Sequence, residues 1–278
     1  MSERDERPAV PFERIEPGEP VGTLEYELTE DFVGRHLRAT GQEPYADPSI
    51  APISILAAEG VNLADRFWDI SESIHAGQQL EVLALPRLGD VLTVTGVARD
   101  KFVKKGRRYV VAETSTRNAR GEPIARGAVT GVIVYSDGDG SGSGAAAART
   151  AEPPPRPLAT LGPLVRSMTH EAMVLYEPPG EKNLHTDDEV ARQAGLPAAI
   201  ATGTLFLAYV FDLLHRSYGD ASRVGTSLDV RIRLPVFAGD RVETTADVLS
   251  RDGGRVEHAI RVAGPHGDAI VGRASVRS

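Results

Sequence analysis

The chain has 278 residues, enough for one large domain or for two of ordinary size. Hydrophobic residues make up 41% and charged residues 25%, a balance that is typical of a globular protein and excludes a mainly disordered chain. Because there is no cysteine, disulfides, thiolate metal sites and a cysteine nucleophile are excluded. The formal net charge of −8 disfavours non-specific nucleic-acid binding, so we expect small-molecule chemistry and no nucleic-acid partner.

The first twenty residues are charged and rich in proline, where a secretory signal would need an apolar run. No stretch of the sequence approaches the length of a membrane span. We therefore expect a cytoplasmic protein without a membrane partner.

The first strong helical candidate is ISILAAEGVNLADRFW, residues 53–68. A strand follows, IHAGQQLEVLAL, in which we interpret His75 as a structural residue. After the Gly-Asp turn at Asp90, apolar and polar residues alternate through residues 91–100 and again from residue 107 onward. Alternation with a period of two is typical of half-buried strands. We predict about three long antiparallel strands here.

A basic run lies at the predicted hairpin between the first two of these strands. A solvated turn is one interpretation; attraction to the phosphates of coenzyme A or to an acidic carrier protein is the other. The residues of this run are Lys101, Lys104, Lys105, Arg107 and Arg108.

The segment SDGDGSGSGAAAARTAEPPPRP, residues 136–157, joins a Gly/Ser/Ala tract to a proline cluster. Neither part can bury enough apolar surface to order itself. We predict a linker between an N-terminal domain, residues 1–135, and a C-terminal domain, residues 158–278.

The second half repeats the pattern of the first. A Gly-Asp turn at Asp240 follows the one at Asp90 by 150 residues, and Gly267 follows Gly121 by 146. The difference of four residues between these two offsets falls in a hairpin, where a duplication tolerates changes of length. A second helical candidate, residues 200–219, is apolar nearly all round and therefore buried. One helix wrapped by an antiparallel sheet, present twice, predicts an α+β double hot-dog fold.

The densest polar cluster, residues 177–206, precedes and enters this second helix. Asp187 or Thr186 can cap a short helix that runs to about Ala194 and ends at Gly195. We interpret that helix and its acidic first turn as structural.

The remaining polar residues of the cluster are candidates for chemistry. Glu181, Asn183 and His185 lie in the loop ahead of the short helix, and Thr202 and Gly203 lie at the start of the long one. The unpaired amides of a helix N-terminus can hold a developing oxyanion. Histidine can take and return a proton near neutrality.

The residues from Gly180 to Asp187 read GEKNLHTD and are similar to the motif G-D-x-N-P-x-H-x-D. Glu181 stands where the motif has aspartate, and one residue between Asn183 and His185 is missing. Residues 230–240, VRIRLPVFAGD, are similar to a second signature, R-x-x-P-V-x-x-G-D. On these motifs the chain resembles the MaoC-like (R)-specific enoyl-CoA hydratase/dehydratase family, and its double hot-dog members with an N-terminal dehydratase-like half.

The resemblance implies a hydro-lyase that adds water to an enoyl thioester of CoA or an acyl carrier protein, or removes it from a 3-hydroxyacyl thioester, in fatty acid or polyketide metabolism. Water would be activated by His185 and Glu181, and the longer glutamate would recover the reach lost in the shorter loop. No metal or redox cofactor is required. The implied site residues are His185, Glu181 and Asn183 as catalytic residues, Gly203 as the oxyanion amide, and Thr202 and Thr204 as substrate contacts.

Residues 40–56, at the matching place in the first half, contain neither histidine nor an acid pair. We therefore expect one catalytic centre. The resemblance implies that the degenerate half shapes the acyl tunnel of a pseudo-dimer, which could pair again as a homodimer.

Three alternatives remain at this point. A hot-dog thioesterase usually carries its carboxylate on or near the central helix, where the second helix offers only Asp212, late in its apolar stretch. A catalytically silent acyl-thioester-binding subunit is the second alternative. The third is a cyclase, in which a substrate hydroxyl replaces water.

Overall fold

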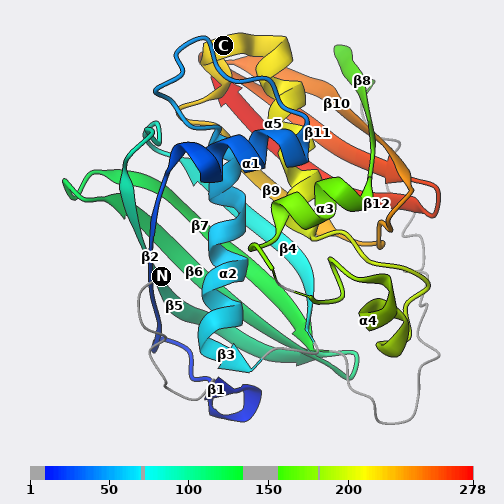
Figure 1. Cartoon of the computed structure of the whole chain (residues 1–278). Coiled ribbons are helices and arrows are strands. Elements are labelled where there is room, and N and C mark those ends of the chain that lie inside the picture. Colours follow the sequence, from blue (N-terminus) through cyan, green and yellow to red (C-terminus); the bar gives the residue numbers. More distant parts are fainter. Residues whose placement is uncertain (1–9, 70–72, 134–155, 181, 278) are drawn as a thin grey trace.

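The structure is a computed structural model, and it describes residues 10–69, 73–133, 156–180 and 182–277. Most of the predicted linker, residues 136–157, lies outside the described residues. The strands form a ten-stranded antiparallel sheet and a short parallel pair. Together with the helices they have the predicted α+β double hot-dog architecture (Figure 1).

The first half supplies five strands to the large sheet, two to the small pair, and four helical segments. In chain order its elements are β1 (Val10–Pro11), η1 (Phe12–Arg14), β2 (Pro20–Glu27), α1 (Glu30–Thr40), η2 (Ile53–Ala58), α2 (Glu59–Phe67), β3 (Trp68–Asp69), β4 (Ser73–Val82), β5 (Val91–Lys104), β6 (Arg107–Asn118) and β7 (Pro123–Ile133).

The second half supplies the other five strands. In chain order its elements are β8 (Ala159–Ser167), α3 (His170–Tyr176), α4 (Asp188–Gln193), α5 (Gly203–Tyr218), η3 (Gly219–Ser222), β9 (Ser227–Ile232), β10 (Arg241–Asp252), β11 (Arg255–Gly264) and β12 (Gly267–Arg277).

The large sheet has the order β2-β5-β6-β7-β4-β9-β12-β11-β10-β8, so the strand order of one half mirrors that of the other. The halves join where β4 pairs with β9, with Leu80 opposite Leu228. The three long strands predicted in each half are β5, β6 and β7, and β10, β11 and β12. One continuous sheet therefore crosses the boundary between the halves.

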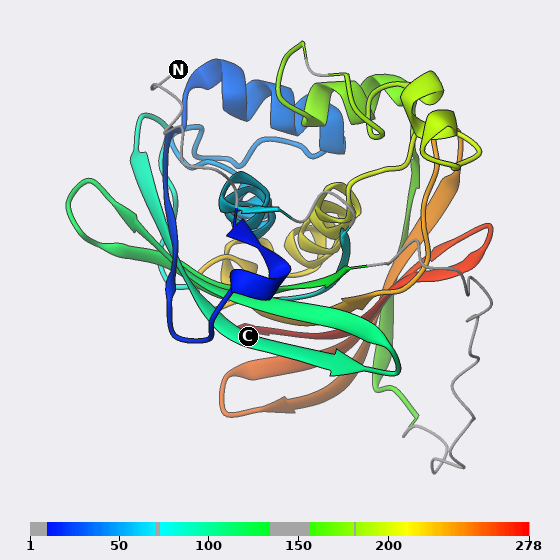
Figure 2. The same ribbon diagram turned by 90° about the horizontal axis from the view of Figure 1, so that it is seen from below.

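The two central helices lie in the hollow of this curved sheet. Figure 2 shows α2 and α5 nearly end-on within the curve, with α1 and α3 across its open side. Residues 204–214 of α5 are all buried, as its apolar sequence predicts. The main hydrophobic core includes residues of both halves, among them Leu56, Leu80, Phe206 and Leu228. The halves therefore share one core.

Equivalent hydrogen bonds repeat at the predicted offset. The amide of Ala51 donates to the carbonyl of Pro86 at 2.9 Å, and 150 residues later the amide of Ala201 donates to Val236 at 2.8 Å. These bonds hold the start of each central helix against the loop that precedes the Gly-Asp turn. The duplication seen in the sequence is thus present in the backbone contacts.

The difference in residue number between equivalent positions of the two halves is smaller before the central helices than at their start. Thr29 and Thr169 cap α1 and α3 at equivalent positions, and they are only 140 residues apart. The second half therefore has ten more residues between this cap and its central helix. The additional length accommodates α4 and the loop of His185.

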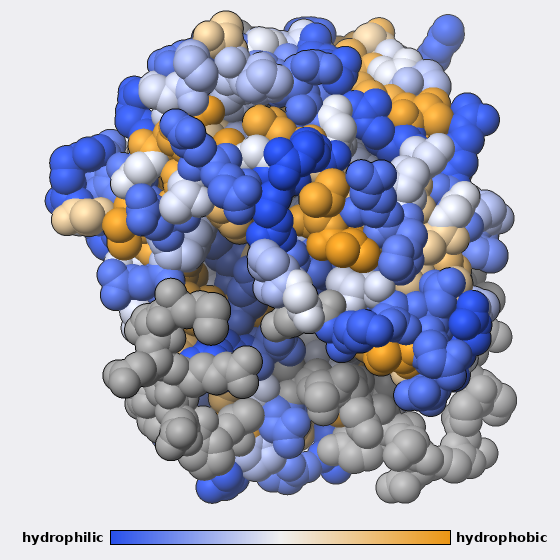
Figure 3. Space-filling view, viewed as in Figure 1, coloured by the Kyte–Doolittle hydropathy of each residue, from blue (hydrophilic) through white to orange (hydrophobic). Residues whose placement is uncertain are grey.

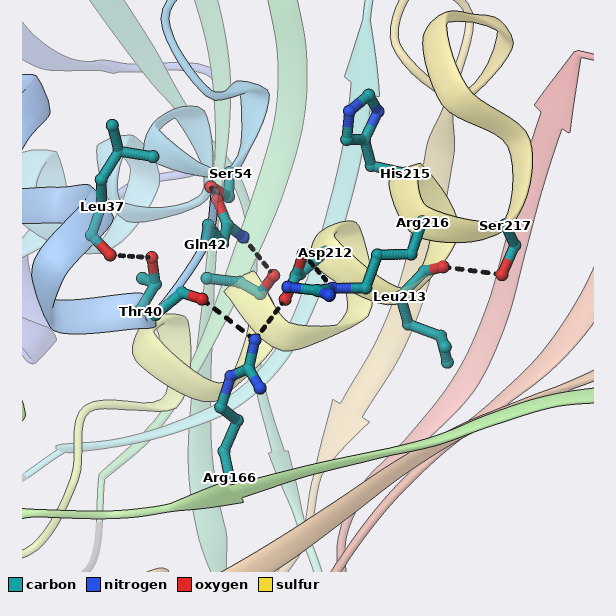
Figure 4. A network of polar contacts seen from close by, with 12 residues as sticks. Leu37, Thr40, Gln42, Ser54, Arg166, Asp212, Leu213, His215, Arg216 and Ser217 are labelled. Carbon is teal, nitrogen blue, oxygen red and sulfur yellow. Dashed lines mark hydrogen bonds and ion pairs between the residues drawn. The ribbon is translucent and has the colours of Figure 1, made fainter. Parts of the chain in front are cut away.

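A buried ion pair of the second half is hydrogen-bonded to the end of α1 in the first half (Figure 4). Asp212 on α5 is 4% exposed and accepts a hydrogen bond of 2.7 Å from Arg166 of β8. Arg166 also donates to the main-chain oxygen of Gly41, which ends α1. Gln42 in turn donates to the carbonyl of Ala208 on α5 at 2.6 Å. The late acid of the second central helix therefore has a structural role.

The face seen in Figure 1 is largely hydrophilic, with small apolar patches between charged groups (Figure 3). Within the described part of the chain, no helix combines the length and the apolar character that crossing a bilayer requires.

Candidate functional site

The candidate site lies where α5 begins. Gly203 is the first helical residue and Thr202 is its N-cap by position. The Thr202 side chain makes no capping hydrogen bond, so the first amides of the helix are not satisfied by it. The helix N-terminus therefore retains donors that could bind an anionic or carbonyl oxygen.

The loop of His185 is a tight turn held by Asn183. The Asn183 side-chain oxygen accepts a hydrogen bond of 2.8 Å from the backbone amide of His185, and its carbonyl accepts one of 3.1 Å from Thr186. Asp187 then caps α4, and the backbone amides of Val190 and Glu189 hold its pKa low. The predicted short helix and its cap are confirmed. Asn183 contacts the backbone that carries the imidazole.

His185 is fixed to the segment that enters α5. Its Nδ1 lies 2.7 Å from the carbonyl oxygen of Ile200, and the amide of Ile200 donates to the carbonyl of Leu184 at 3.0 Å. Because a carbonyl oxygen only accepts, Nδ1 must carry the proton, and Nε2 of the neutral ring has the lone pair. The His185 ring is thus bonded to Ile200, which lies three residues before Gly203. The ring has the tautomer that a general base needs, with the lone pair on Nε2.

Glu177 also reaches the start of α5, which the sequence did not reveal. The hydroxyl of Thr202 donates to the Glu177 carboxylate at 2.5 Å. Arg35 of the first half fixes this residue by donating to the main-chain oxygens of Leu175 and Glu177. Glu177 opens the polar cluster, but no motif marks it.

His75 reaches the same helix start from the first half. A Cβ added to Gly203 would lie 3.0 Å from Nδ1 of His75 and 2.7 Å from Cδ1 of Ile232. Both ring nitrogens of His75 are buried and have no hydrogen-bond partner among the described residues. Burial lowers the pKa of His75 to about 4, and the Gly77 backbone opposes this fall. The interpretation of His75 as a structural residue with satisfied polar groups is not supported.

The other two predicted site residues are Thr204 and Glu181. Thr204 is 1% exposed within α5, beside Tyr176, whose pKa is raised by burial and lowered in part by the Thr204 hydroxyl. Glu181 lies outside the described residues. Their roles as substrate contact and catalytic acid stay predictions.

The first half differs at the equivalent of the helix start. At the offset of 150, Pro52 and buried Ile53 stand in place of Thr202 and Gly203. Proline has no amide hydrogen, and isoleucine carries a side chain where Gly203 has none, so that another residue cannot approach the backbone as His75 approaches Gly203. These substitutions agree with a single candidate site, in the second half.

The first half does carry one buried acid on its central helix. Glu59, at the start of α2, is 5% exposed and accepts hydrogen bonds from Tyr26 at 2.7 Å and Thr116 at 2.5 Å. Burial raises its pKa to about 7. Because each carboxylate oxygen binds a hydroxyl, Glu59 joins α2 to β2 and β6.

The basic run lies at the β5–β6 hairpin, as predicted. Lys101 donates to the main-chain oxygen of Glu13 at 3.1 Å, and Arg108 forms an ion pair with the Glu13 side chain. Both cations also lie over the ring of Phe12. Part of this run therefore packs against the N-terminal segment.

Other regions offer weaker candidates. A groove of about 500 Å³ lies at the β4–β9 joint, with Gln79, Glu81 and Asp229 in its lining. Gln79 and Glu81 alternate along β4 with the buried Gln78 and Leu80, so the groove is on the face opposite the helices. Among the described residues, no three His, Asp or Glu side chains are grouped as metal ligands.

Comparison with known proteins gives a consistent assignment. Residues 161–265 match the family described as MaoC like domain. The second half is a MaoC-like domain. A search of curated proteins finds no match to the chain. The predicted resemblance to the MaoC-like dehydratase family is confirmed, and this match includes His185, Gly203 and the loop between them.

Solved structures confirm the fold over nearly the whole chain. A MaoC-like dehydratase has a TM-score of 0.76 at 16% identity, covering 96% of this chain and 99% of its own. A conserved hypothetical protein of Mycobacterium tuberculosis with a double hot-dog fold has a TM-score of 0.65 at 12% identity, with coverages of 96% and 97%.

A third similar structure is a larger protein. The full-length peroxisomal multifunctional enzyme type 2 of Drosophila melanogaster has a TM-score of 0.70 at 20% identity. The match covers 93% of this chain and 48% of that enzyme. At these identities the three structures establish the shared fold.

Proposed function

We propose that the protein is a hydro-lyase that hydrates trans-2-enoyl thioesters or, in reverse, dehydrates 3-hydroxyacyl thioesters. The observation that carries the proposal is the hydrogen bond from Nδ1 of His185 to the carbonyl of Ile200, three residues before the start of α5, because it leaves Nε2 as the basic nitrogen of the ring. A base and an amide-rich helix terminus are the two groups that this reaction needs.

In the proposed hydration, Nε2 of His185 removes a proton from water while the water oxygen bonds to C3 of the enoyl group. The π electrons move onto the thioester oxygen, where the Gly203 amide stabilises the enolate charge. Glu181, protonated at the start, supplies the proton that C2 receives and becomes a carboxylate, and the proton that His185 holds then restores the carboxylic acid. Dehydration follows the same steps backwards.

The remaining site residues position these groups. Asn183 fixes the loop by binding the backbone amide of His185. Thr202 and Thr204 flank Gly203 in the sequence and contact the acyl thioester in the proposal. The catalytic domain is then residues 158–278, while residues 1–135 form a degenerate domain that shapes the acyl tunnel.

The test is the hydration of crotonyl-CoA and longer enoyl-CoAs, followed by the loss of absorbance of the conjugated thioester. Wild-type protein is expected to turn over at least one of them, and His185→Ala should reduce the rate by about 10²-fold or more. Repeating the assay with enoyl thioesters of an acyl carrier protein distinguishes the carriers.

Other products would contradict the proposal. Release of free CoA would indicate a thioesterase. Binding without turnover of either carrier's thioester would indicate a silent acyl-binding subunit. A cyclic product from a hydroxylated enoyl thioester, without turnover of simple enoyl thioesters, would indicate a cyclase.

A further inference from the structure

A bulge in β4 directs His75 toward the helices. The pairing of β4 with β7 shifts register between His75 and Gly77, so one residue of β4 is left over. Gln78 and Leu80 are buried, and a regular alternation would also place Ile74 on the buried side. Ile74 is instead 57% exposed, and the His75 ring lies against Gly203. Such bulges re-aim side chains.

Burying the two ring nitrogens of His75 costs free energy, and no hydrogen bond within the described protein offsets this cost. Burying a polar group without a hydrogen bond is unfavourable by roughly 1–3 kcal/mol. Both nitrogens of His75 are in that state, whereas the buried His258 bonds to Tyr218 and His36 bonds to Ser54. A ligand oxygen that accepts from the His75 ring would remove this cost.

The geometry allows one oxygen to bind both His75 and the helix terminus. A Cβ lies about 2.4 Å from its own backbone nitrogen, from standard bond lengths. Since the added Cβ of Gly203 would be 3.0 Å from Nδ1 of His75, that nitrogen is at most about 5.4 Å from the Gly203 amide nitrogen. Two donors at that separation can both reach an oxygen about 2.7–3.1 Å from each.

We propose that His75 is a second oxyanion donor, which binds the thioester carbonyl oxygen together with the Gly203 amide. This inference rests on the proposed function and assigns the first half a direct part in the reaction, because β4 belongs to that half. The lowered pKa keeps the ring neutral, so it can donate its N–H without competing with His185 as a charged acid.

The first test is kinetic, with His75→Phe, which keeps a ring and removes the donor. We expect kcat for crotonyl-CoA to fall by about 10²–10³-fold, the loss typical for one oxyanion donor. The melting temperature should not fall, because no hydrogen bond within the described protein is removed. His258→Phe is the matched control: it removes an imidazole bonded to Tyr218 and should reduce stability while retaining turnover.

The second test is independent of turnover. Infrared difference spectra of bound butyryl-CoA with an isotope-labelled carbonyl should show a lowered carbonyl stretch in wild type, and a smaller lowering in His75→Phe. Wild-type kcat in His75→Phe would overturn the role of His75 and leave the proposed function standing. If the wild type hydrates no enoyl thioester, the proposed function fails. Equal lowering of the carbonyl stretch in the two proteins, or no lowering in either, overturns the role of His75 as a donor.

Discussion

The hydroxyl of Thr202 donates a 2.5 Å hydrogen bond to the carboxylate of Glu177, which joins the end of α3 to the start of α5. Two acids are thus associated with the candidate site: Glu177 by this contact, and Glu181 by its place in the motif. Because the carboxylate of Glu177 already binds a protein hydroxyl, we expect it to position the start of α5 and not to act as the catalytic acid.

The two acids should respond differently to loss of charge. Glu177→Gln keeps an oxygen that Thr202 can bind, so we expect kcat for enoyl thioester hydration to change by less than about tenfold. Glu181→Gln removes the proposed acid and should lower kcat by about 10²-fold. Steady-state kinetics on the pair provides the measurement, and the reverse ranking would transfer the acid role to Glu177.

Gly203 should not tolerate a side chain. In Gly203→Ala the new Cβ would lie 2.7 Å from Cδ1 of Ile232 and 3.0 Å from Nδ1 of His75, so the Ile232 side chain, the His75 ring or the start of α5 must shift. Overpacking of this kind costs about 1–3 kcal/mol and would misplace the oxyanion amide. We expect a lower melting temperature and at least a tenfold lower kcat.

A second substitution tests that explanation. Ile232→Val removes the methyl group that the new Cβ would meet, so the double variant Gly203→Ala, Ile232→Val should recover part of both losses. Ile232→Val alone is the control, with an expected cost of about 1 kcal/mol. Strictly additive effects of the two changes would argue against the steric account.

Asp212 should contribute to stability through its two arginines. It is 4% exposed and binds Arg166 at 2.7 Å and Arg216 at 2.9 Å, while these partners are 23% and 45% exposed and can be partly hydrated. Asp212→Asn should therefore lower the free energy of unfolding by about 2 kcal/mol, less than for a fully buried pair. Urea unfolding measures this.

An exposed ion pair of the same length is the control for Asp212. Asp268 binds Arg261 at 2.7 Å, with the side chains 31% and 55% exposed. Asp268→Asn should cost less than about 1 kcal/mol, because water screens this pair. Equal losses for the two variants would show that burial of Asp212 adds nothing.

Local sequence patterns were sufficient for the elements with strong periodicity. Alternation after the Gly-Asp turns at Asp90 and Asp240 predicted the long strands, and the apolar run through residues 205–214 predicted α5. Helix α3 was not predicted, because seven residues with a mixed face give little periodic signal. Local patterns also do not specify that β4 pairs with β9, since that contact joins distant parts of the chain.

The candidate site was predicted only in part, for a related reason. His185 and its short helix follow from a local motif, and the structure places them beside the start of α5. The position of the His75 ring beside Gly203 could not be predicted, because a one-residue bulge in β4 changes which side of the strand a residue faces. Glu177 was missed because its partner, Thr202, is 25 residues away.

The buried Glu59 should make the free energy of unfolding depend on pH. Burial raises its pKa from 4.5 to about 7 in the folded state. The unfolded chain therefore releases this proton at lower pH than the folded protein. The stabilisation from Glu59 is fully present below about pH 4.5 and is lost as pH rises to about 7, by roughly 3 kcal/mol in total.

Glu59→Gln should remove this part of the profile, because the amide stays neutral and can still bind the hydroxyls of Tyr26 and Thr116. The buried His36 and His75, with pKa values lowered to about 3 and about 4, act in the opposite direction and destabilise the fold as pH falls. They are common to both proteins, so the difference between wild type and Glu59→Gln in urea unfolding from pH 4 to 8 isolates Glu59. As pH rises, the free energy of unfolding of wild type should fall relative to that of Glu59→Gln. A difference between the two proteins that does not depend on pH would show that Glu59 titrates normally.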